Sequence, residues 1–379
     1  MRVLVVDTYY PAFLTAHYAA APGLEHRSYD EQWRVLMGRR FGTSDAYSYH
    51  LRKLGHEAVE IVANCEPLQL AWSRDHGHQS KLARLGGIFP ARVRALARRS
   101  NLVSVALAQI DAFQPDVVYL QDLWFFGART LASLRRGDRL VVGQLASALP
   151  PMRRLRSIDL ITTALPQYVA QFRALGIETK FLGIAFYERL TDSLGGLDID
   201  TAASSAQRHH ALTFVGGLSP RLYAEGTRVL ERVARELPLD VWGFGVEDLP
   251  VDSALRRRYR GEAWGLDMYT LLAQSGITLN RHGEVAGGYA ANMRLFEATG
   301  VGALLVTNSA KNLSDLFEPG REVVTYETPA DLVEKLRHYA EHDDERQQIA
   351  AAGQRRTLSE HTYAQRIPEL AEMLEAHLR

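Results

Sequence analysis

Short apolar runs alternate along the chain with longer segments in which apolar residues recur every three or four positions. The short runs are rich in Val, Ile and Leu, which favours β-strands, and the longer segments have the periodicity of amphipathic helices. Strands that alternate with helices are typical of βαβ units, in which the strands form a parallel sheet. The pattern therefore predicts an α/β protein.

In the first half, a long helical region at about 68–113 lies between the second and third predicted strands. The predicted strands are residues 2–7, 57–62, 116–120, 139–145 and 160–164. Residues 187–208 are polar, rich in small residues and without clear periodicity, so they are predicted to be a linker.

The pattern then restarts, which predicts a second α/β domain over residues 209–358 after a first domain over residues 1–186. Its predicted strands are 211–217, 239–245, 276–280, 303–307 and 322–326, and the helices between them are 224–238, 266–275 and 289–300. Residues 359–379 are predicted to form a closing helix that packs toward the first domain, with Thr362 as its N-cap. Ligands of such open sheets bind at the carboxyl ends of the strands, where we expect the functional residues.

Composition narrows the functional classes. The chain has 379 residues, 46% of them hydrophobic and 23% charged, and a formal net charge of zero, which favours neither nucleic acid nor an anionic membrane as a partner. Cys65 is the sole cysteine, so an internal disulfide is excluded and a reducing compartment is expected. The opening apolar run ends at Asp7 and is interpreted as a strand and not as a signal peptide. A cytoplasmic protein with at most peripheral membrane contact is expected.

Glu297 is a carboxylate within a mostly apolar helix that leads into the strand at 303–307. Arg294 lies three residues earlier, on the same helical face. The two could form an ordinary exposed ion pair. Alternatively, Glu297 could accept hydrogen bonds from both hydroxyls of a ribose. The residues by themselves leave these two interpretations even.

Other polar and glycine-containing segments follow predicted strands. Gly217 would allow close approach of a ligand to the backbone and Arg221 could reach a phosphate, but a plain strand-to-helix turn with a solvated arginine is the preferred interpretation of that segment. Trp264 could stack on a planar base or anchor the core, and His282 could contact a ligand or be a structural histidine. The loop that contains Gly287 and Gly288 is predicted to open a helix whose N-terminus would attract a pyrophosphate.

The motifs "LDMYTLLAQSGITLN", "ANMRLFEATGVGALLVTN", "LSDLFEPGREVVTYETPADLVEKL" and "AAAGQRRTLSEHTYAQR" between residues 258 and 366 resemble the C-terminal domain of CgeB-type (spore-maturation-like) glycosyltransferases. These enzymes are related to glycosyltransferase family 4. The resemblance implies the GT-B fold: two Rossmann-like doubly wound domains that face a cleft. It also implies that residues 1–186 bind the acceptor and residues 209–358 bind a nucleotide-sugar.

The resemblance implies that Glu297 holds the donor ribose, that Arg221 faces the diphosphate and that the "GEAWG" loop lies near the base. The second family glutamate is replaced by Tyr289, with Glu284 as a possible substitute. The complete predicted donor site comprises Glu297, Arg221, Gly217, Arg294, Asn292, Trp264, His282, Gly288, Tyr289, Gly42 and Thr43.

In the first domain, Gly42 precedes a predicted helix that Thr43 or Ser44 would cap, and Tyr9 and Tyr10 could line an acceptor pocket or pack in the core. Asp122 ends one strand, and Gln144 and Ser147 follow the next. Seven basic residues lie between positions 74 and 99 against one acid. A solvated helix face is the favoured interpretation of this run, ahead of a surface for an anionic or membrane-bound acceptor.

These features predict a glycosyltransferase of the hexosyltransferase type that moves a sugar from a nucleoside diphosphate, by default UDP, to a hydroxyl of a glycan, lipid-linked or small-molecule acceptor. The resemblance to glycosyltransferase family 4 favours retention, and neither a metal nor another cofactor is expected. Inversion would need a general base, for which Asp122 and His17 are the candidates. The alternatives are a degenerate GT-B protein that binds nucleotide or glycan without turnover, and a GT-B nucleotide-sugar epimerase.

Overall fold

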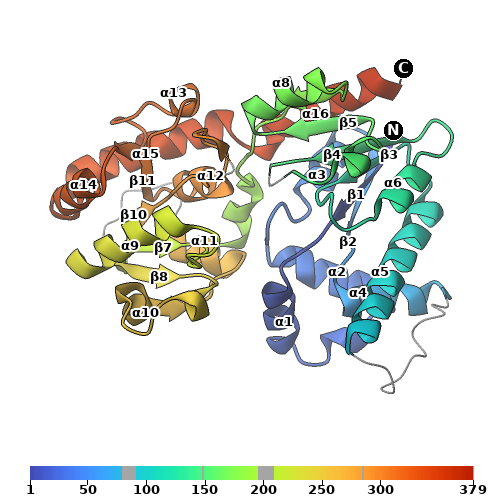
Figure 1. Ribbon diagram of the computed structural model, residues 1–379, viewed down its shortest axis with the longest axis horizontal. Helices are drawn as coiled ribbons and strands as arrows, with labels where there is room; N and C mark the ends of the chain where they lie inside the picture. The colour runs from blue at the N-terminus through green and yellow to red at the C-terminus, as the bar shows by residue number, and fades with distance from the viewer. Residues whose placement is uncertain (79–90, 147–148, 195–208, 284–285, 379) are drawn as a thin grey trace. The chain divides into compact units, whose positions relative to one another are not determined.

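The computed structural model describes residues 1–78, 91–146, 149–194, 209–283 and 286–378. The chain divides into two compact units. Unit 1 comprises residues 1–182 and 367–379, and unit 2 comprises residues 183–366. Each is built on its own parallel sheet with helices packed against it (Figure 1).

The sheet of unit 1 has the strand order β2-β1-β3-β4-β5-β6, and every described pairing in it is parallel. The strands are β1 (Arg2–Asp7), β2 (Glu57–Val62), β3 (Val117–Leu120), β4 (Leu140–Gln144), β5 (Leu160–Thr163) and β6 (Thr179–Phe181). All four residues of β3 are buried, as expected of a central strand covered by helices on both faces. The five strands predicted from the first half are confirmed, with β6 added at the edge.

The helices of unit 1 begin with residues that suit helix starts. Ser28 caps α2, since its hydroxyl accepts from the Glu31 N–H at 3.3 Å, and proline occupies the first turn of α1, α4 and α8. The helices are α1 (Pro11–Ala19), α2 (Tyr29–Gly38), α3 (Ala46–Lys53), α4 (Glu66–Asp75), α5 (Ala91–Phe113), α6 (Ala128–Leu134), α7 (Met152–Leu155) and α8 (Pro166–Ala174), with a short 3-10 turn, η1, at Leu24–His26.

The sheet of unit 2 has the order β12-β11-β10-β7-β8-β9, again with parallel pairings. The strands are β7 (His210–Val215), β8 (Asp240–Trp242), β9 (Tyr259–Gly261), β10 (Ser275–Leu279), β11 (Leu304–Asn308) and β12 (Val324–Tyr326). Sequence analysis missed β9, a short edge strand whose arginine and glycine give little strand signal.

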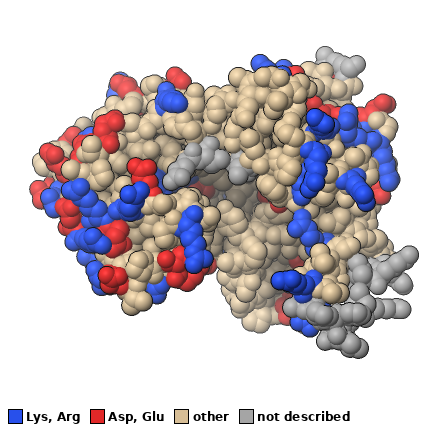
Figure 2. All heavy atoms as spheres, viewed as in Figure 1, with Lys and Arg blue, Asp and Glu red and all other residues tan. Residues whose placement is uncertain are grey.

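Helices cover unit 2 from both sides of its sheet. α9 and α14 pack together on one face, and α12 and α15 pack together against β11 on the other. The helices of this unit are α9 (Ala224–Glu236), α10 (Ala254–Arg258), α11 (Leu266–Ala273), α12 (Met293–Gly300), α13 (Leu313–Leu316), α14 (Pro329–Glu341) and α15 (Asp343–Glu360), with 3-10 turns η2 (Glu188–Ser193) and η4 (Val246–Asp248). The last helix, α16 (Tyr363–Leu378), begins in unit 2 and belongs to unit 1 from residue 367 onward. Basic and acidic side chains lie next to each other on the visible surface of this unit (Figure 2), as in the Arg232–Glu236 pair of α9 at 3.0 Å.

Two predicted helix starts are corrected. The helix expected at 289–300 begins at Met293, so Gly287 and Gly288 lie in a separate turn and do not open it. In unit 1, α3 begins at Ala46 with Asp45 at the N-cap. Ser44 does not cap it, because its hydroxyl donates to the Met37 carbonyl at 2.8 Å.

The structure also describes part of the predicted linker and the start of the last predicted helix. Part of the expected linker, residues 188–193, forms η2, where Leu190 is fully buried; residues 195–208 lie outside the described part of the chain. Thr362 directly precedes α16, and its N–H donates to the side chain of Gln365 at 2.7 Å, which is half of a capping box. Among the described residues, every helix is too short or too polar to cross a lipid bilayer.

Candidate functional site

The polar residues singled out in unit 2 gather where β7, β10 and β11 end. Because these neighbouring strands are parallel, their carboxyl ends lie at one edge of the sheet. The segment after β7 contains Gly216 and Gly217, and the segment after β10 contains Asn280, Arg281 and His282. This edge is therefore built from loops that are far apart in the sequence.

Glu297 lies on α12 and is 6% exposed. Its Oε2 is 2.8 Å from Nη1 of Arg294, and its Oε1 accepts from the Tyr269 hydroxyl at 3.3 Å. Arg294 also donates from Nε to the carbonyl of Val215, the last residue of β7, at 3.3 Å. The pair is thus a buried one at the carboxyl end of β7, and the exposed-pair interpretation of Glu297 is wrong.

Arg281 fixes the glycine turn after β7. Its guanidinium donates to the carbonyl of Gly217 and lies over the ring of Tyr223, at 4.5 Å from the centroid. A Cβ on Gly217 would lie 2.4 Å from the Tyr223 ring, and a Cβ on Gly226 would lie 2.4 Å from the arginine itself. Glycine is therefore required at these positions by packing within the site.

A partly buried amide pair connects the end of β10 to the start of α12. The Asn292 amide donates to the Asn280 side-chain oxygen at 2.7 Å and to the Arg281 carbonyl at 3.0 Å, while Asn280 donates to Thr307 Oγ1 at 3.1 Å. Asn292 thus has a positioning role at the N-terminus of α12. It orients that terminus relative to the ends of β10 and β11.

His282 has a structural partner on one ring nitrogen. Its Nε2 lies 3.2 Å from Thr307 Oγ1, while its Nδ1 has no hydrogen-bond partner in the described part of the chain. Burial lowers the pKa of His282 to about 4, so the ring is neutral at pH 7. The structural interpretation of this histidine is therefore supported by its contact with Thr307.

The Gly287–Gly288 turn carries a lysine that the sequence analysis did not single out. Lys311, after β11, donates from Nζ to the Gly287 carbonyl at 3.1 Å and from its backbone N–H to the Gly288 carbonyl at 2.9 Å. Its ammonium also lies 5.1 Å from the centroid of the Tyr289 ring. Tyr289 therefore packs on a cation at the position of the missing glutamate, and Glu284 lies outside the described residues.

Two further predicted donor residues lie near the protein surface. Arg221 is 81% exposed in its side chain and pairs with Asp248 at 3.2 Å. Trp264 stacks on Phe244 with centroids 6.1 Å apart and donates to Glu262 at 2.9 Å. The indole is half-buried and packs within unit 2.

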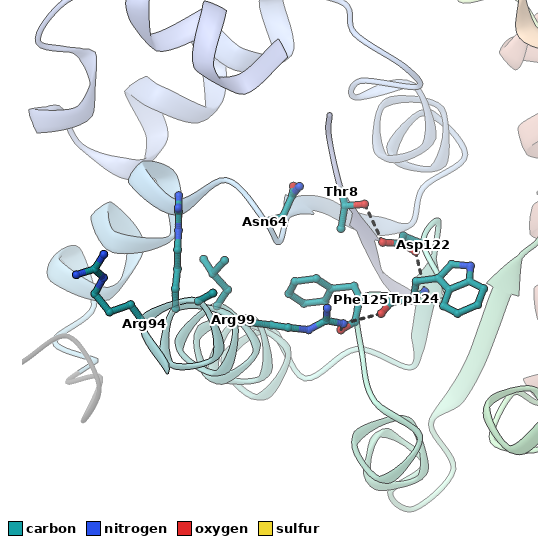
Figure 3. A pocket seen from close by; sticks show the side chains of 10 residues that line it. Thr8, Asn64, Arg94, Arg99, Asp122, Trp124 and Phe125 are labelled. Atoms are coloured by element: carbon teal, nitrogen blue, oxygen red, sulfur yellow. Dashed lines mark hydrogen bonds between the residues drawn. The ribbon is translucent and has the colours of Figure 1, made fainter. Parts of the chain in front are cut away.

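In unit 1, the ends of β1, β2 and β3 contribute to a cavity of about 530 Å³ (Figure 3). Asp122 lies in its wall, where its carboxylate accepts from the Thr8 hydroxyl at 2.9 Å and from the Trp124 N–H at 2.7 Å. The cavity is lined by Thr8, Asn64, Arg94, Ala95, Arg98, Arg99, Leu102, Asp122, Trp124 and Phe125. Part of the basic run thus lines a cavity, while the side chains of Arg94, Arg98 and Arg99 stay exposed, as the favoured interpretation of a solvated helix face predicts.

The other predicted residues of unit 1 lie elsewhere. Tyr9 is 3% exposed and packs edge-on against Phe41 at 5.0 Å, so it is a core residue and not a pocket wall, whereas Tyr10 is 54% exposed. Gly42 has a φ of +59°, which glycine adopts without strain. Thr43 does not cap α3; its hydroxyl accepts from Gln121 at 3.3 Å.

His17 is a poor general base in this structure. It is 3% exposed, and burial lowers its pKa to about 4, so the ring has little affinity for a proton taken from a substrate hydroxyl. Of the two residues proposed as a base, Asp122 alone lines the cavity.

Arg281, Lys311 and Thr8 were missed or undervalued as site residues. Each follows a predicted strand directly or within a few residues, and this position was the available signal. It was not sufficient, because the partner of each side chain lies in a different strand-to-helix segment.

Comparison with known proteins gives a family match in the part of the chain that contains several of these site residues. Residues 225–372 match a family model described as glycosyl transferase-like, and that range contains Glu297, Arg294 and Arg281. A comparison with curated protein sequences gives no significant match.

Solved structures match over nearly the whole chain. Anabaena Alr3699/HepE in complex with UDP-glucose has a TM-score of 0.61 at 15% identity, covering 99% of this chain and 100% of that one. Sucrose-phosphate synthase from Thermosynechococcus elongatus has a TM-score of 0.59 at 12% identity, covering 99% and 100%. AviGT4, a glycosyltransferase involved in avilamycin A biosynthesis, has a TM-score of 0.55 at 15% identity, covering 100% and 98%.

The fold is GT-B. The two parallel six-stranded sheets with their helices match those of GT-B glycosyltransferases, as predicted. Within this GT-B chain, the buried Glu297 pair and the glycine turn held by Arg281 lie in unit 2, and the cavity beside Asp122 lies in unit 1.

Proposed function

We propose that this GT-B protein is a glycosyltransferase that transfers a hexosyl group from a nucleoside-diphosphate sugar, with UDP as the first nucleotide to test. The observation that carries the proposal is the buried Glu297–Arg294 pair at the carboxyl end of β7, inside the segment that matches the glycosyl transferase-like family. The UDP-glucose complex of the structurally similar Alr3699/HepE supports the choice of nucleotide.

Glu297 is proposed to bind the ribose of the donor. Its two oxygens each have one partner, Arg294 or Tyr269, and a carboxylate oxygen can accept a second hydrogen bond. Arg294 would orient the carboxylate, because charge-assisted hydrogen bonds are short and directional. Ribose recognition would therefore use a carboxylate whose geometry is set before the donor arrives.

Transfer breaks the bond between the anomeric carbon and the diphosphate oxygen, and the electron pair leaves with the diphosphate. A bond then forms from the acceptor hydroxyl oxygen to that carbon, and with retention the hydroxyl proton passes to the departing phosphate oxygen. Cationic donors stabilise the leaving charge, and Arg221 and Arg281 are the proposed sources in unit 2. This route needs neither a side-chain base nor a metal.

The first test measures the thermal stability of the whole chain with UDP, GDP, ADP, CDP and dTDP. A nucleotide at 100 times its dissociation constant should stabilise unit 2 by about 2.7 kcal/mol. We expect Glu297→Gln to lose most of the response to the preferred nucleotide.

Glu318→Gln is the matched control, because Glu318 forms an exposed pair with Arg321 at the same three-residue spacing, at 3.1 Å. If no nucleotide stabilises the wild type, or if the two variants respond alike, the proposed donor site is wrong. Product analysis with a UDP-sugar then separates the alternatives, since an epimerase converts the sugar without an acceptor and a degenerate protein binds without turnover.

A further inference from the structure

The cavity of unit 1 has an uneven distribution of charge. Arg94, Arg98 and Arg99 line it from α5, while Asp122 is the one carboxylate among its lining residues. Arg94 lies at one end of the labelled side chains, Asp122 lies next to Trp124 toward the other end, and Arg99 lies between them (Figure 3). One end of the cavity is therefore cationic, and the other carries a carboxylate next to the Thr8 hydroxyl.

The helical periodicity of α5 explains why these arginines share a wall. Residues 94, 98 and 102 are spaced by four and residues 95 and 99 are one position further on, so all five lie on one side of the helix. Arg92 is two positions from Arg94, on a different side of the helix, and does not line the cavity. The cationic wall is thus one face of α5 and not the whole basic run.

The three arginines are not equivalent. Arg99 donates to the carbonyls of Trp124 and Phe125 at 2.9 and 3.2 Å, which ties α5 to the loop after β3. Arg98 pairs with Glu66 at 2.5 Å but is 61% exposed in its side chain. Within the described part of the chain, Arg94 makes no hydrogen bond or ion pair.

We infer that this cavity binds an acceptor that carries an oxyanion, a phosphate or a carboxylate, which Arg94 and Arg98 recognise. Guanidinium groups match both oxyanions by paired N–H donors. The acceptor hydroxyl would lie toward Asp122 and Thr8, at the opposite end. A cavity of about 530 Å³ is within the range of small-ligand sites. This inference rests on the proposed function only in that it calls the bound molecule an acceptor. Binding of the oxyanion itself does not depend on turnover.

The test uses the fluorescence of Trp124, which lines the cavity, with Trp124→Phe to identify its contribution. The whole chain is titrated with glucose 6-phosphate, glucuronate, inorganic phosphate and glucose, with excess UDP present to occupy unit 2. We expect saturable responses to the charged ligands and a far weaker response to glucose. Arg94→Gln should weaken charged-ligand binding about tenfold, as expected for one lost charge-assisted hydrogen bond, and Arg92→Gln should not.

Equal binding of glucose and glucose 6-phosphate, or equal effects of Arg92→Gln and Arg94→Gln, would overturn the inference. Vesicles of phosphatidylglycerol, compared with phosphatidylcholine, distinguish a lipid headgroup from a soluble oxyanion. Vesicle binding that Arg94→Gln abolishes assigns the oxyanion to a headgroup, whereas vesicle binding lost only in Arg92→Gln contradicts the cavity as the site. UDP stabilisation without anion binding defeats this inference alone, and anion binding without any nucleotide response defeats only the proposed donor site.

Discussion

At the scale of single residues, burial decides what Glu297 and Arg294 do. Their side chains are 8% and 14% exposed, so neither charge can be left without its partner except at considerable cost in free energy. The exposed pair Glu318–Arg321 has the same spacing but side-chain exposures of 60% and 74%. Pairs of that exposed kind contribute little to stability. The same two residue types therefore have different roles that spacing alone does not distinguish.

Removing the charge of Glu297 should therefore destabilise unit 2. We expect Glu297→Gln to lower the unfolding free energy by about 3 kcal/mol, because it leaves the Arg294 guanidinium buried without its counter-ion. Urea unfolding of Glu297→Gln, Arg294→Met and the double variant measures the coupling between the two sites, which should exceed about 1 kcal/mol. The corresponding cycle at Glu318 and Arg321 should give a coupling close to zero, and strictly additive effects at Glu297 and Arg294 would contradict the buried pair.

At the scale of secondary-structure elements, close backbone approach positions the helices of unit 2. α15 packs against the segment before β12 at Gly353, where a Cβ would lie 2.2 Å from the carbonyl oxygen of Glu322. Behind it, Thr299 of α12 and Thr357 of α15 share a hydrogen bond at 2.6 Å. The helix that carries Glu297 is therefore held by a neighbour whose own position depends on a glycine.

A methyl group at Gly353 should thus disturb both helices. We expect Gly353→Ala to lower the unfolding free energy by about 1–3 kcal/mol, the usual cost of overpacking. Gly38→Ala, at the end of α2, is the matched control, since a Cβ there meets no atom within 4 Å. That change should be neutral or stabilise by up to about 1 kcal/mol, because alanine favours helix more than glycine. Thermal unfolding of both variants measures the difference, and equal shifts would contradict the close packing.

At the scale of the whole molecule, buried ionisable groups couple stability to pH. Burial raises the pKa of Glu60 to about 8 and that of Asp7 to about 7. Unfolded carboxyl groups titrate near pH 4, so above about pH 4 the folded chain keeps protons that the unfolded chain has lost. Stability contributed by these groups therefore falls as the pH rises toward their folded values. His17, with its pKa lowered to about 4, opposes this trend only below about pH 6.5, where the unfolded histidine is protonated.

Between pH 6.5 and 8, the contribution of Glu60 and Asp7 to stability therefore changes with pH without an opposing contribution from His17. We expect the unfolding free energy of unit 1 to fall across this interval, by up to about 1.4 kcal/mol per pH unit for each group that stays protonated. Glu60→Gln should reduce the slope, because the amide keeps an acceptor for the Ser48 N–H without a titrating proton. Urea unfolding at several pH values measures it, and an unchanged slope would show that Glu60 titrates normally.

The sequence by itself determined the described strands other than β6 and β9, because strand and helix patterns are local and a strand buried on both faces must be continuously apolar. It also drew attention to Glu297, since a carboxylate in an apolar helix stands out against its neighbours. The predicted GT-B architecture agrees with the structure and with its solved relatives. The starts of α3 and α12 were misplaced in the prediction. Asp45 and Asn292 are the N-cap residues, and nearby small and polar residues are equally suitable for that position.

Only the tertiary structure decided which residues of distant segments contact each other. Arg281 reaches Gly217 across 64 positions and Thr8 reaches Asp122 across 114, and separations of this size leave no periodic trace in the sequence. The same holds for Tyr9, which became a core residue, and for Arg94, which is exposed and also lines a cavity. A residue's neighbours along the chain fix its helix or strand and its face. Which other segment that face meets depends on how the sheet orders its strands, and the charge and burial of the site follow from that order.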